Sequence, residues 1–140
     1  MRENEENKEI NRIDTDQNRQ RLLAELTSHI GAPNAIGMGE LYEIVFERPW
    51  SHRINDTRKV RRLITIMRRE GVAICSTSGA SDGGYYLAAA GSELAHYLRR
   101  SERRALLLLQ RVAKIKRISL PNYLGQLQLN VEGGDYGDAA

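Results

Sequence analysis

The strongest hydrophobic pattern in the chain is a helical one that begins near residue 55. Four apolar residues recur there at spacings of three and four, which places them on one narrow stripe of a helix. Asn55 is a suitable N-cap, and Gly71 is a suitable residue for leaving the helix. We therefore expect a helix from Asn55 to about residue 70 with one buried face. The stripe consists of Val60, Leu63, Ile64 and Met67.

A β-hairpin is predicted directly after this helix. Residues 72–76 have the apolar composition of a strand, and residues 85–88 have that of a returning strand. Between them, residues 77–84 form a loop rich in glycine and serine, which we call the wing loop. The order helix, strand, glycine-rich loop and strand is typical of a winged helix-turn-helix.

Two shorter helices and a short strand are predicted ahead of this stretch. The first helix is expected over residues 19–30, with Leu22, Leu23, Leu26 and Ile30 on its apolar face. The second is expected from residue 38 or 39 to Phe46, with Leu41, Ile44 and Val45 pointing inward. Ala35 and Ile36 can supply a short strand between the two helices. The connection over residues 47–54 is longer than a minimal helix-turn-helix turn, and we expect Trp50 to fold back onto the core.

The region after residue 91 predicts one long helix. Ser92 is a suitable N-cap, and neither proline nor glycine occurs from Leu94 to Arg117. Apolar and small residues recur with alternating spacings of four and three, as in a short coiled coil, so we expect self-association. A helix folded back onto a single core is the alternative. The residues expected to mediate self-association are Leu94, Leu98, Ala105, Leu108, Val112 and Ile115.

These patterns predict a mostly α fold with a small β-hairpin. Its parts are a disordered or weakly helical arm over residues 1–17, a winged helix-turn-helix over 18–90, and a helical extension over 91–131. Residues 132–140 are expected to form a disordered acidic tail. The pattern over residues 118–131 leaves open a short helix followed by a strand, or an arm laid over a partner.

Charge is distributed unevenly, although the net charge is only +3. Residues 1–20 carry six acids against four bases, whereas residues 58–69 carry six bases and no acid. Residues 99–117 carry eight bases and one acid. Such local positive fields attract a polyanion more than the modest total suggests.

The basic helix predicts binding to double-stranded DNA. The major groove admits one helix, and the arginine side chain suits guanine edges and phosphates. The alternatives are that its charged face is simply solvated, and that the base-free wing loop is a plain hairpin turn. The predicted DNA-binding residues are Arg48, Arg53, Asn55, Thr57, Arg58, Lys59, Arg61, Arg62, Thr65 and Arg69.

Enzymatic and membrane functions find no support in the sequence. The three histidines are scattered without metal-ligand spacing, and Cys75 is the only cysteine, so we expect no metal, no cofactor and no catalytic activity. The wing loop is not followed by the helix and lysine of a phosphate-binding P-loop. No apolar run is long enough to span a membrane, and the acidic start is unlike a targeting peptide, so we expect a cytoplasmic protein.

Residues 18–90 resemble the winged helix of the biotin operon repressor type. The similarity rests on the recognition-helix pattern from Val60 to Gly71 and on the sequence Gly-Tyr-Tyr-Leu at residues 84–87. It implies a DNA-binding module but no biotin chemistry, because no ligase domain follows. Small phage and mobile-element proteins also combine such a module with a basic helical tail, which is a looser resemblance.

A dimeric transcription regulator is therefore the expected function. One alternative is a phage-type replication or DNA-organising protein, which would bind DNA in clusters with weak specificity. A second alternative is a protein-interaction adaptor that uses the leucine-rich helix and binds no DNA.

Overall fold

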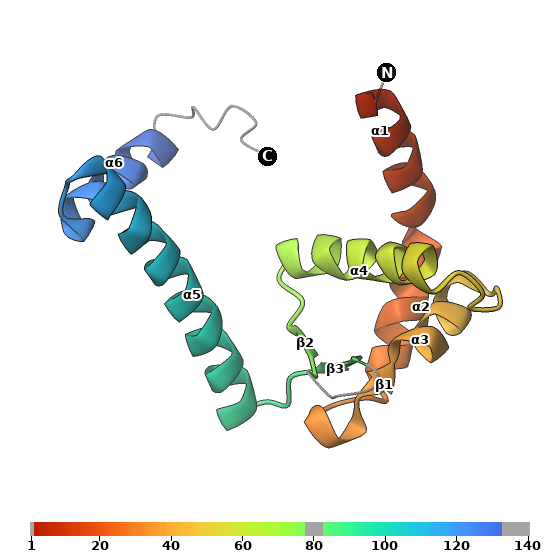
Figure 1. Cartoon of the computed structure of the whole chain (residues 1–140). Helices are drawn as coiled ribbons and strands as arrows, with labels where there is room; N and C mark the ends of the chain where they lie inside the picture. Colours follow the sequence, from red (N-terminus) through yellow and green to blue (C-terminus); the bar gives the residue numbers. More distant parts are fainter. Residues whose placement is uncertain (1, 78–82, 133–140) are drawn as a thin grey trace. The chain divides into compact units, whose positions relative to one another are not determined.

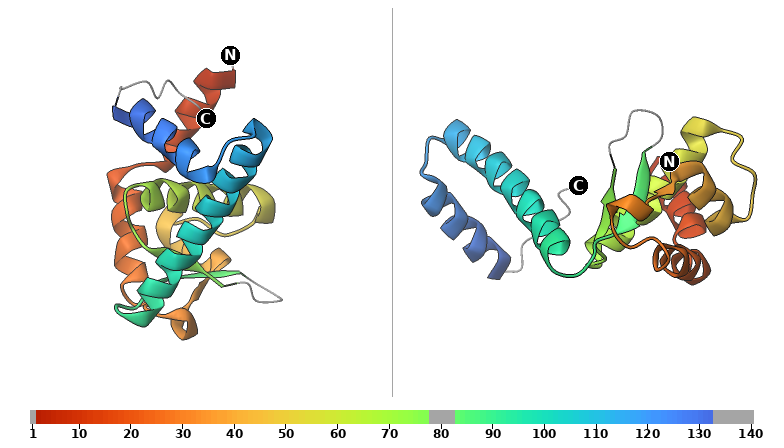
Figure 2. Two further views of the ribbon diagram at one scale, coloured as in Figure 1. Left: turned by 90° about the vertical axis from the view of Figure 1, so that its left-hand side faces the viewer. Right: turned by 90° about the horizontal axis from the view of Figure 1, so that it is seen from below.

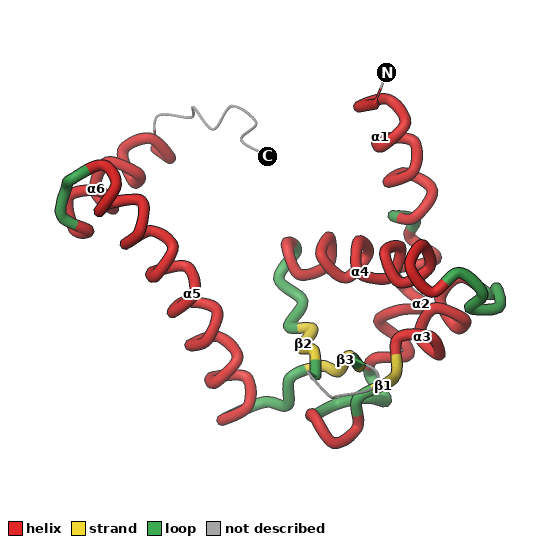
Figure 3. The backbone as a smooth tube through the Cα atoms, viewed as in Figure 1, coloured by secondary structure: helices red, strands yellow, loops and turns green. Residues whose placement is uncertain are grey.

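The computed structural model describes residues 2–77 and 83–132, and these residues are mostly helical with a small antiparallel sheet (Figures 1 and 3). The chain forms two compact units that divide after Tyr97, inside a long helix. Among the described residues, no helix combines the length and the apolar composition needed to cross a membrane.

The first unit contains the helices and strands that the sequence pattern predicts, together with an additional N-terminal helix. A short 3-10 turn over Ala32–Asn34 precedes the first strand. The elements are α1 (Arg2–Ile13), α2 (Asp16–Leu26), β1 (Ile36–Gly37), α3 (Met38–Phe46), α4 (Arg53–Arg69), β2 (Ile74–Ser76) and β3 (Gly84–Leu87).

The sheet is antiparallel, with strand order β1-β3-β2. Its hairpin pairs Cys75 with Tyr86, and its first strand pairs Ile36 with Tyr85. The strand predicted at Ala35–Ile36 therefore exists, shifted by one residue. It joins the hairpin into one sheet, so the segment ahead of α3 is fixed against the strands that follow α4.

The core lies where α3 packs against both α2 and α4. The predicted stripe of α4 is confirmed, since each of its four residues is at most 2% exposed. Leu41 and Val45 of α3 are fully buried, while Ile44 is only partly buried. Burial on one side leaves the opposite side of α4 free for polar residues.

The start and end of α2 differ from the prediction of residues 19–30. The helix begins at Asp16, because the Thr15 side chain caps it and accepts a hydrogen bond from the Asn18 amide at 3.1 Å. It ends at Leu26, four residues early, and Ile30 is 48% exposed instead of buried. The backbone of Ile30 pairs with Leu87 in an isolated β-bridge, so this segment is extended and does not continue the helix.

His29 fastens the turn after α2 through both ring nitrogens. Nδ1 lies 2.7 Å from the Asn34 carbonyl oxygen, and Nε2 lies 2.9 Å from a Glu25 carboxylate oxygen. Both partners accept hydrogen bonds, so the doubly protonated ring fits best. The hydrogen bond to Glu25 is the main cause that raises the pKa of His29 above 6.5, with the Asn34 carbonyl second.

This arrangement predicts that stability falls as the pH rises. The raised pKa contributes stability that is complete below pH 6.5 and is lost as the pH rises through the folded-state pKa. Replacing His29 with glutamine should cost about 1 kcal/mol at pH 5.5, the value of a partly exposed ion pair, and much less at pH 9. Urea unfolding at both pH values measures the difference. His96→Gln, at an exposed site on the long helix, is the control; an equal cost at both pH values for His29→Gln would contradict the assignment.

The N-terminal arm is helical from Arg2 to Ile13. Most of its residues are exposed, but Ile13 is only 4% exposed and belongs to the core. The structure thus has a regular helix where disorder or weak helicity was expected. The buried Ile13 anchors the C-terminal end of α1 beside α4.

The second unit is built from a helical hairpin (Figure 2). The predicted long helix is confirmed as α5 (Ser92–Lys116), and α6 (Leu120–Glu132) turns back along it. Ala113 is the buried residue of α5, and the Lys116 ammonium lies 5.3 Å from the centre of the Tyr123 ring. The first alternative for residues 118–131 is wrong in part, because a single helix forms and no strand follows it within the described part. The acidic tail lies outside the described residues from 133 onward.

Candidate nucleic-acid interface

The outer side of α4 presents arginine without exposed acid. The helix contains a single acidic residue, Asp56, which is 4% exposed and points into the protein. Its charge is therefore not displayed beside the arginines. Of the predicted DNA contacts on α4, Thr57, Lys59 and Arg62 are half-buried. The exposed ones are Arg53, Asn55, Arg58, Arg61, Thr65 and Arg69.

The start of α4 corrects the predicted N-cap. The helix begins at Arg53, with His52 in the cap position, so Asn55 already lies in the first turn and does not cap it. Asp56 performs the capping instead: one carboxylate oxygen accepts from the amides of Ser51 at 3.2 Å and His52 at 3.0 Å. The acidic residue of the first turn thus satisfies amides at the helix start.

The protonation of Asp56 depends on the same contacts. Burial alone would raise the pKa of its carboxyl, but hydrogen bonds from the His52 amide, the Tyr42 hydroxyl and the Ser51 amide outweigh it. The result is a pKa below the usual 3.8. Asp56 is therefore charged at neutral pH and holds the start of α4 against α3.

The other end of α4 is fixed by backbone and side-chain contacts. Gly71 adopts a φ of 93°, and the amides of Gly71 and Val72 donate to the carbonyls of Arg68 and Met67, which forms a Schellman motif. Arg19 donates to the Glu70 carboxylate at 2.6 and 2.7 Å and also pairs with Asp14. The hydrogen bond from Arg19 lowers the pKa of Asp14. With both ends held, α4 is a rigid support for its outer side chains.

The connection before α4 folds onto the protein as predicted for Trp50. The indole is packed against the core, and its ring lies directly over Gly39, where any side chain would overlap it. The Trp50 amide donates to a Glu43 carboxylate oxygen at 3.1 Å. The connection is therefore packed against α3 and does not extend freely into solvent.

Two adjoining grooves run along α4 on the side of the hairpin. The first, of about 430 Å³, lies between the start of α3 and Arg53, Thr57 and Arg61. Glu40 and Glu43 also line it, so an anion is disfavoured there. The second, of about 330 Å³, continues past Arg61 to the β2 and β3 strands and contains no acid. Arg61 lines both grooves, which makes it the residue that links the helix face to the hairpin.

Arg68 is a residue of the second groove that the predicted contact set omitted. Its Nε donates to the Ile74 carbonyl at 2.7 Å, which holds the guanidinium against β2. Together with Arg61 it gives the groove two arginines, and Thr65, Ser76 and Thr77 add three hydroxyl groups. The run of six bases signalled Arg68, but helical spacing alone put it on a flank and gave no reason to select it.

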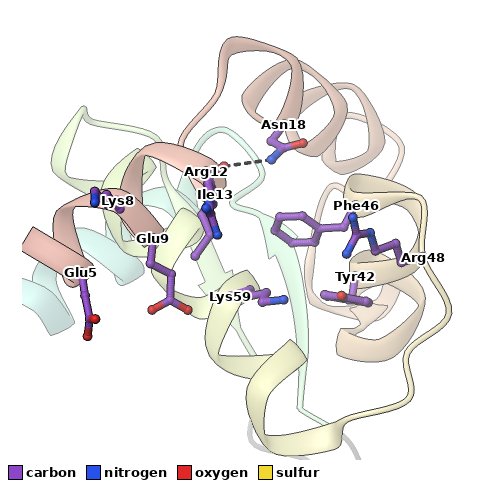
Figure 4. Close-up of a pocket in the computed structure, with 10 residues that line it drawn as sticks. All are labelled: Glu5, Lys8, Glu9, Arg12, Ile13, Asn18, Tyr42, Phe46, Arg48 and Lys59. Atoms are coloured by element: carbon purple, nitrogen blue, oxygen red, sulfur yellow. Dashed lines mark hydrogen bonds between the residues drawn. The ribbon is translucent and has the colours of Figure 1, made fainter.

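Arg48 and Lys59 lie apart from these grooves. Both line a separate pocket beside α1, together with Tyr42 and Phe46 (Figure 4). The ten predicted contacts are thus not brought together on one surface. Most of the wing loop, residues 78–82, lies outside the described part of the chain. The loop is closed at its base by Thr77, whose side-chain oxygen accepts from the Gly84 amide at 3.0 Å.

The residues predicted for self-association are mainly exposed. Leu98, Leu108 and Ile115 are 48%, 57% and 76% exposed, and Ala105 is also exposed. Leu94 and Val112 are half-buried. Leu106 and Leu107, beside this row, are about half exposed. A single hairpin therefore leaves a large apolar area of α5 uncovered.

Comparisons with known proteins add no assignment. No family model matches the chain, and no curated protein or solved structure matches it. Within residues 2–77 and 83–132, no group of three or more histidine, cysteine, aspartate or glutamate residues is arranged to hold a metal ion. A function has to be inferred from the surfaces described above.

Proposed function

We propose that the protein binds double-stranded DNA with α4 in the major groove and acts as a dimeric transcription regulator. The observation that carries the proposal is the outer side of α4, where arginines are exposed and the sole acidic residue of the helix is buried. A rigid helix of this kind, about 10–12 Å across, suits the major groove.

The arrangement of the elements supports a winged helix-turn-helix. A short strand precedes α3, and α4 is followed by a hairpin that pairs with that strand. This is the order expected from the resemblance to the biotin operon repressor type. The acid-free groove between Arg61 and the hairpin supports a phosphate contact on the same side as the helix.

The proposed contacts divide by position along α4. Asn55, Thr57 and Arg58 are near the start of the helix, where recognition helices usually meet base edges. Arg61 and Arg68 face the hairpin and are placed for phosphate. Arg48 and Lys59 are left out of this set because they line the pocket beside α1.

Self-association through α5 completes the proposal. The exposed apolar residues of this helix would be covered by the same residues of a second copy, as in a two-fold symmetric dimer. Two copies of α4 would then read two half-sites of a symmetric DNA site. The same leucine-rich surface also supports the second candidate function, a protein-interaction adaptor that binds a partner and no DNA.

Fluorescence anisotropy across a salt series tests the proposal. A labelled random duplex should bind at 50 mM salt, and the logarithm of the affinity should fall linearly with that of the salt concentration, by about 0.9 per phosphate contacted. Sequence selection then separates the DNA-binding roles. A symmetric preferred site bound ~1000-fold more tightly than random DNA would indicate a regulator, whereas uniform binding would indicate a replication or DNA-organising protein. Absence of binding at 50 mM salt would refute DNA binding and favour the adaptor.

A further inference from the structure

The largest of the described pockets, about 830 Å³, lies between α1, α3 and α4, away from the hairpin grooves (Figure 4). Its position excludes it from the surface proposed for DNA, although two of its basic residues belong to the segments predicted to bind DNA. The pocket is built from three elements that are distant in sequence, so it exists only in the folded protein.

One wall of the pocket is aromatic and fixed. The rings of Tyr42 and Phe46 lie 5.0 Å apart between centroids and are tilted by 35°. Ile13 faces them from the end of α1 (Figure 4). The Ile13 carbonyl accepts a hydrogen bond from the Asn18 side-chain amide at 2.9 Å, which ties the end of α1 to α2. Tyr42 and Ile13 are almost fully buried, so the partly buried Phe46 offers most of the apolar surface that a flat group can contact.

Basic groups surround the apolar wall. Arg48 and Lys59 extend toward Tyr42, and neither forms an ion pair with another residue of the described part of the chain (Figure 4). Lys8 and Arg12 add two further bases from α1. A guanidinium and an ammonium beside one aromatic wall are the usual partners of a phosphate or carboxylate group.

The acids of the pocket restrict which anion can enter. Glu5 and Glu9 of α1 line the same space, opposite the aromatic rings (Figure 4). They would repel the continuous charge of a nucleic-acid backbone but leave room for one compact anionic group near Arg48 and Lys59. A small molecule therefore fits the charge pattern better than a second DNA segment.

The aromatic wall is also connected to α4. The Tyr42 hydroxyl donates a hydrogen bond to Asp56, which caps the start of α4. The aromatic wall is therefore linked to the residue that caps α4.

We infer that this pocket binds a small organic anion, with a flat apolar body against Tyr42 and Phe46 and a phosphate or carboxylate group at Arg48 and Lys59. The inference is independent of the proposed DNA binding and would stand if that failed. The ligand class is that of phenyl phosphate, which carries both features.

Titration of the ¹⁵N-labelled full chain with phenyl phosphate tests the inference by NMR. We expect saturable shifts of the amide signals of Ile13, Tyr42, Phe46 and Lys59, with a Kd of about 1 mM for a probe of this size. Inorganic phosphate and benzyl alcohol, which each carry one of the two features, should bind at least about tenfold more weakly.

Variants locate the site within the chain. Arg48→Ala/Lys59→Ala should weaken phenyl phosphate binding by at least about tenfold. The amide signals away from the pocket should keep their positions, which shows that the variant is folded. Arg2→Ala/Lys114→Ala removes two exposed bases outside the pocket and should leave the Kd unchanged. Non-saturable shifts, saturable shifts confined to other residues, or equal binding by the Arg48→Ala/Lys59→Ala variant would each overturn the inference.

Discussion

Replacing Arg58 and Arg61 with alanine should lower the DNA affinity of the protein by ~100-fold or more at 100 mM salt. Arg58 lies on the exposed outer side of α4, and Arg61 lines both grooves beside the hairpin. If each guanidinium contacts a base edge or a phosphate, the double variant loses both contacts. The salt dependence should also become shallower, by about one unit of slope for each phosphate contact removed.

The loss should not come from unfolding. Both side chains are exposed, and neither donates a side-chain hydrogen bond to another described residue. Exposed substitutions of this kind usually change stability by less than about 0.5 kcal/mol. Urea unfolding of the variant should therefore match the parent.

A charge-matched variant separates specific contact from general attraction. Arg2→Ala/Lys114→Ala also removes two positive charges, but from α1 and α5. It should weaken binding far less than Arg58→Ala/Arg61→Ala. If the two variants lose the same affinity with the same change of slope, α4 is not the DNA-contacting element, even if the parent binds DNA.

The helical period predicts the core-facing side of α4 well because burial repeats with the geometry of the helix. Val60, Leu63, Ile64 and Met67 are buried in one stripe, as expected. The bounds of α3 are confirmed, and β2 and β3 overlap the strands expected at residues 72–76 and 85–88, because these short apolar runs are bordered by glycine, proline or polar residues.

Helix ends depended on contacts that a one-dimensional pattern does not contain. Asp56 caps α4 because Tyr42, fourteen positions earlier, helps to hold its carboxylate. Ile30 does not belong to the apolar face of α2, because its backbone pairs with Leu87 of the sheet. The loose alternation of apolar residues over 118–131 suggests a strand at its end, yet these residues form a helix, and Tyr123 of that helix lies beside Lys116 of α5.

The same limit applies to the candidate interface on α4. The period of α4 indicates which residues point away from the core, but it does not show which element lies beside each flank. The hairpin lies beside Arg61 and Arg68, whereas α1 lies beside Lys59. The predicted set therefore contained residues of two separate surfaces and omitted one arginine of the first.

Replacing Leu108 and Ile115 with glutamate should convert the proposed dimer into a monomer. These side chains are 57% and 76% exposed on α5, so the hairpin does not require them for its own packing. In a dimer they would lie against the same apolar row of a second copy, where each unpaired carboxylate would cost several kcal/mol. Analytical ultracentrifugation at about 5–100 µM, concentrations above a micromolar Kd at which the parent is dimeric, should show one species of half the parent mass.

Gln110→Glu is the control for this change. Gln110 is exposed on the same helix but lies on another face, so its added charge should leave the dimer intact. Circular dichroism should give the parent helix content for all three proteins. A monomeric parent, or a Leu108→Glu/Ile115→Glu variant that still sediments as a dimer, would contradict self-association through this row.

The monomeric variant also tests how the two proposed surfaces cooperate. Its α4 is untouched, so it should still bind DNA with the salt dependence of a single copy. On a selected symmetric site it should lose the gain in affinity that comes from linking two half-site contacts, which can reach 10²–10⁴-fold. An unchanged affinity for that site would mean that each copy of α4 binds independently, and the leucine row would then have to serve another partner.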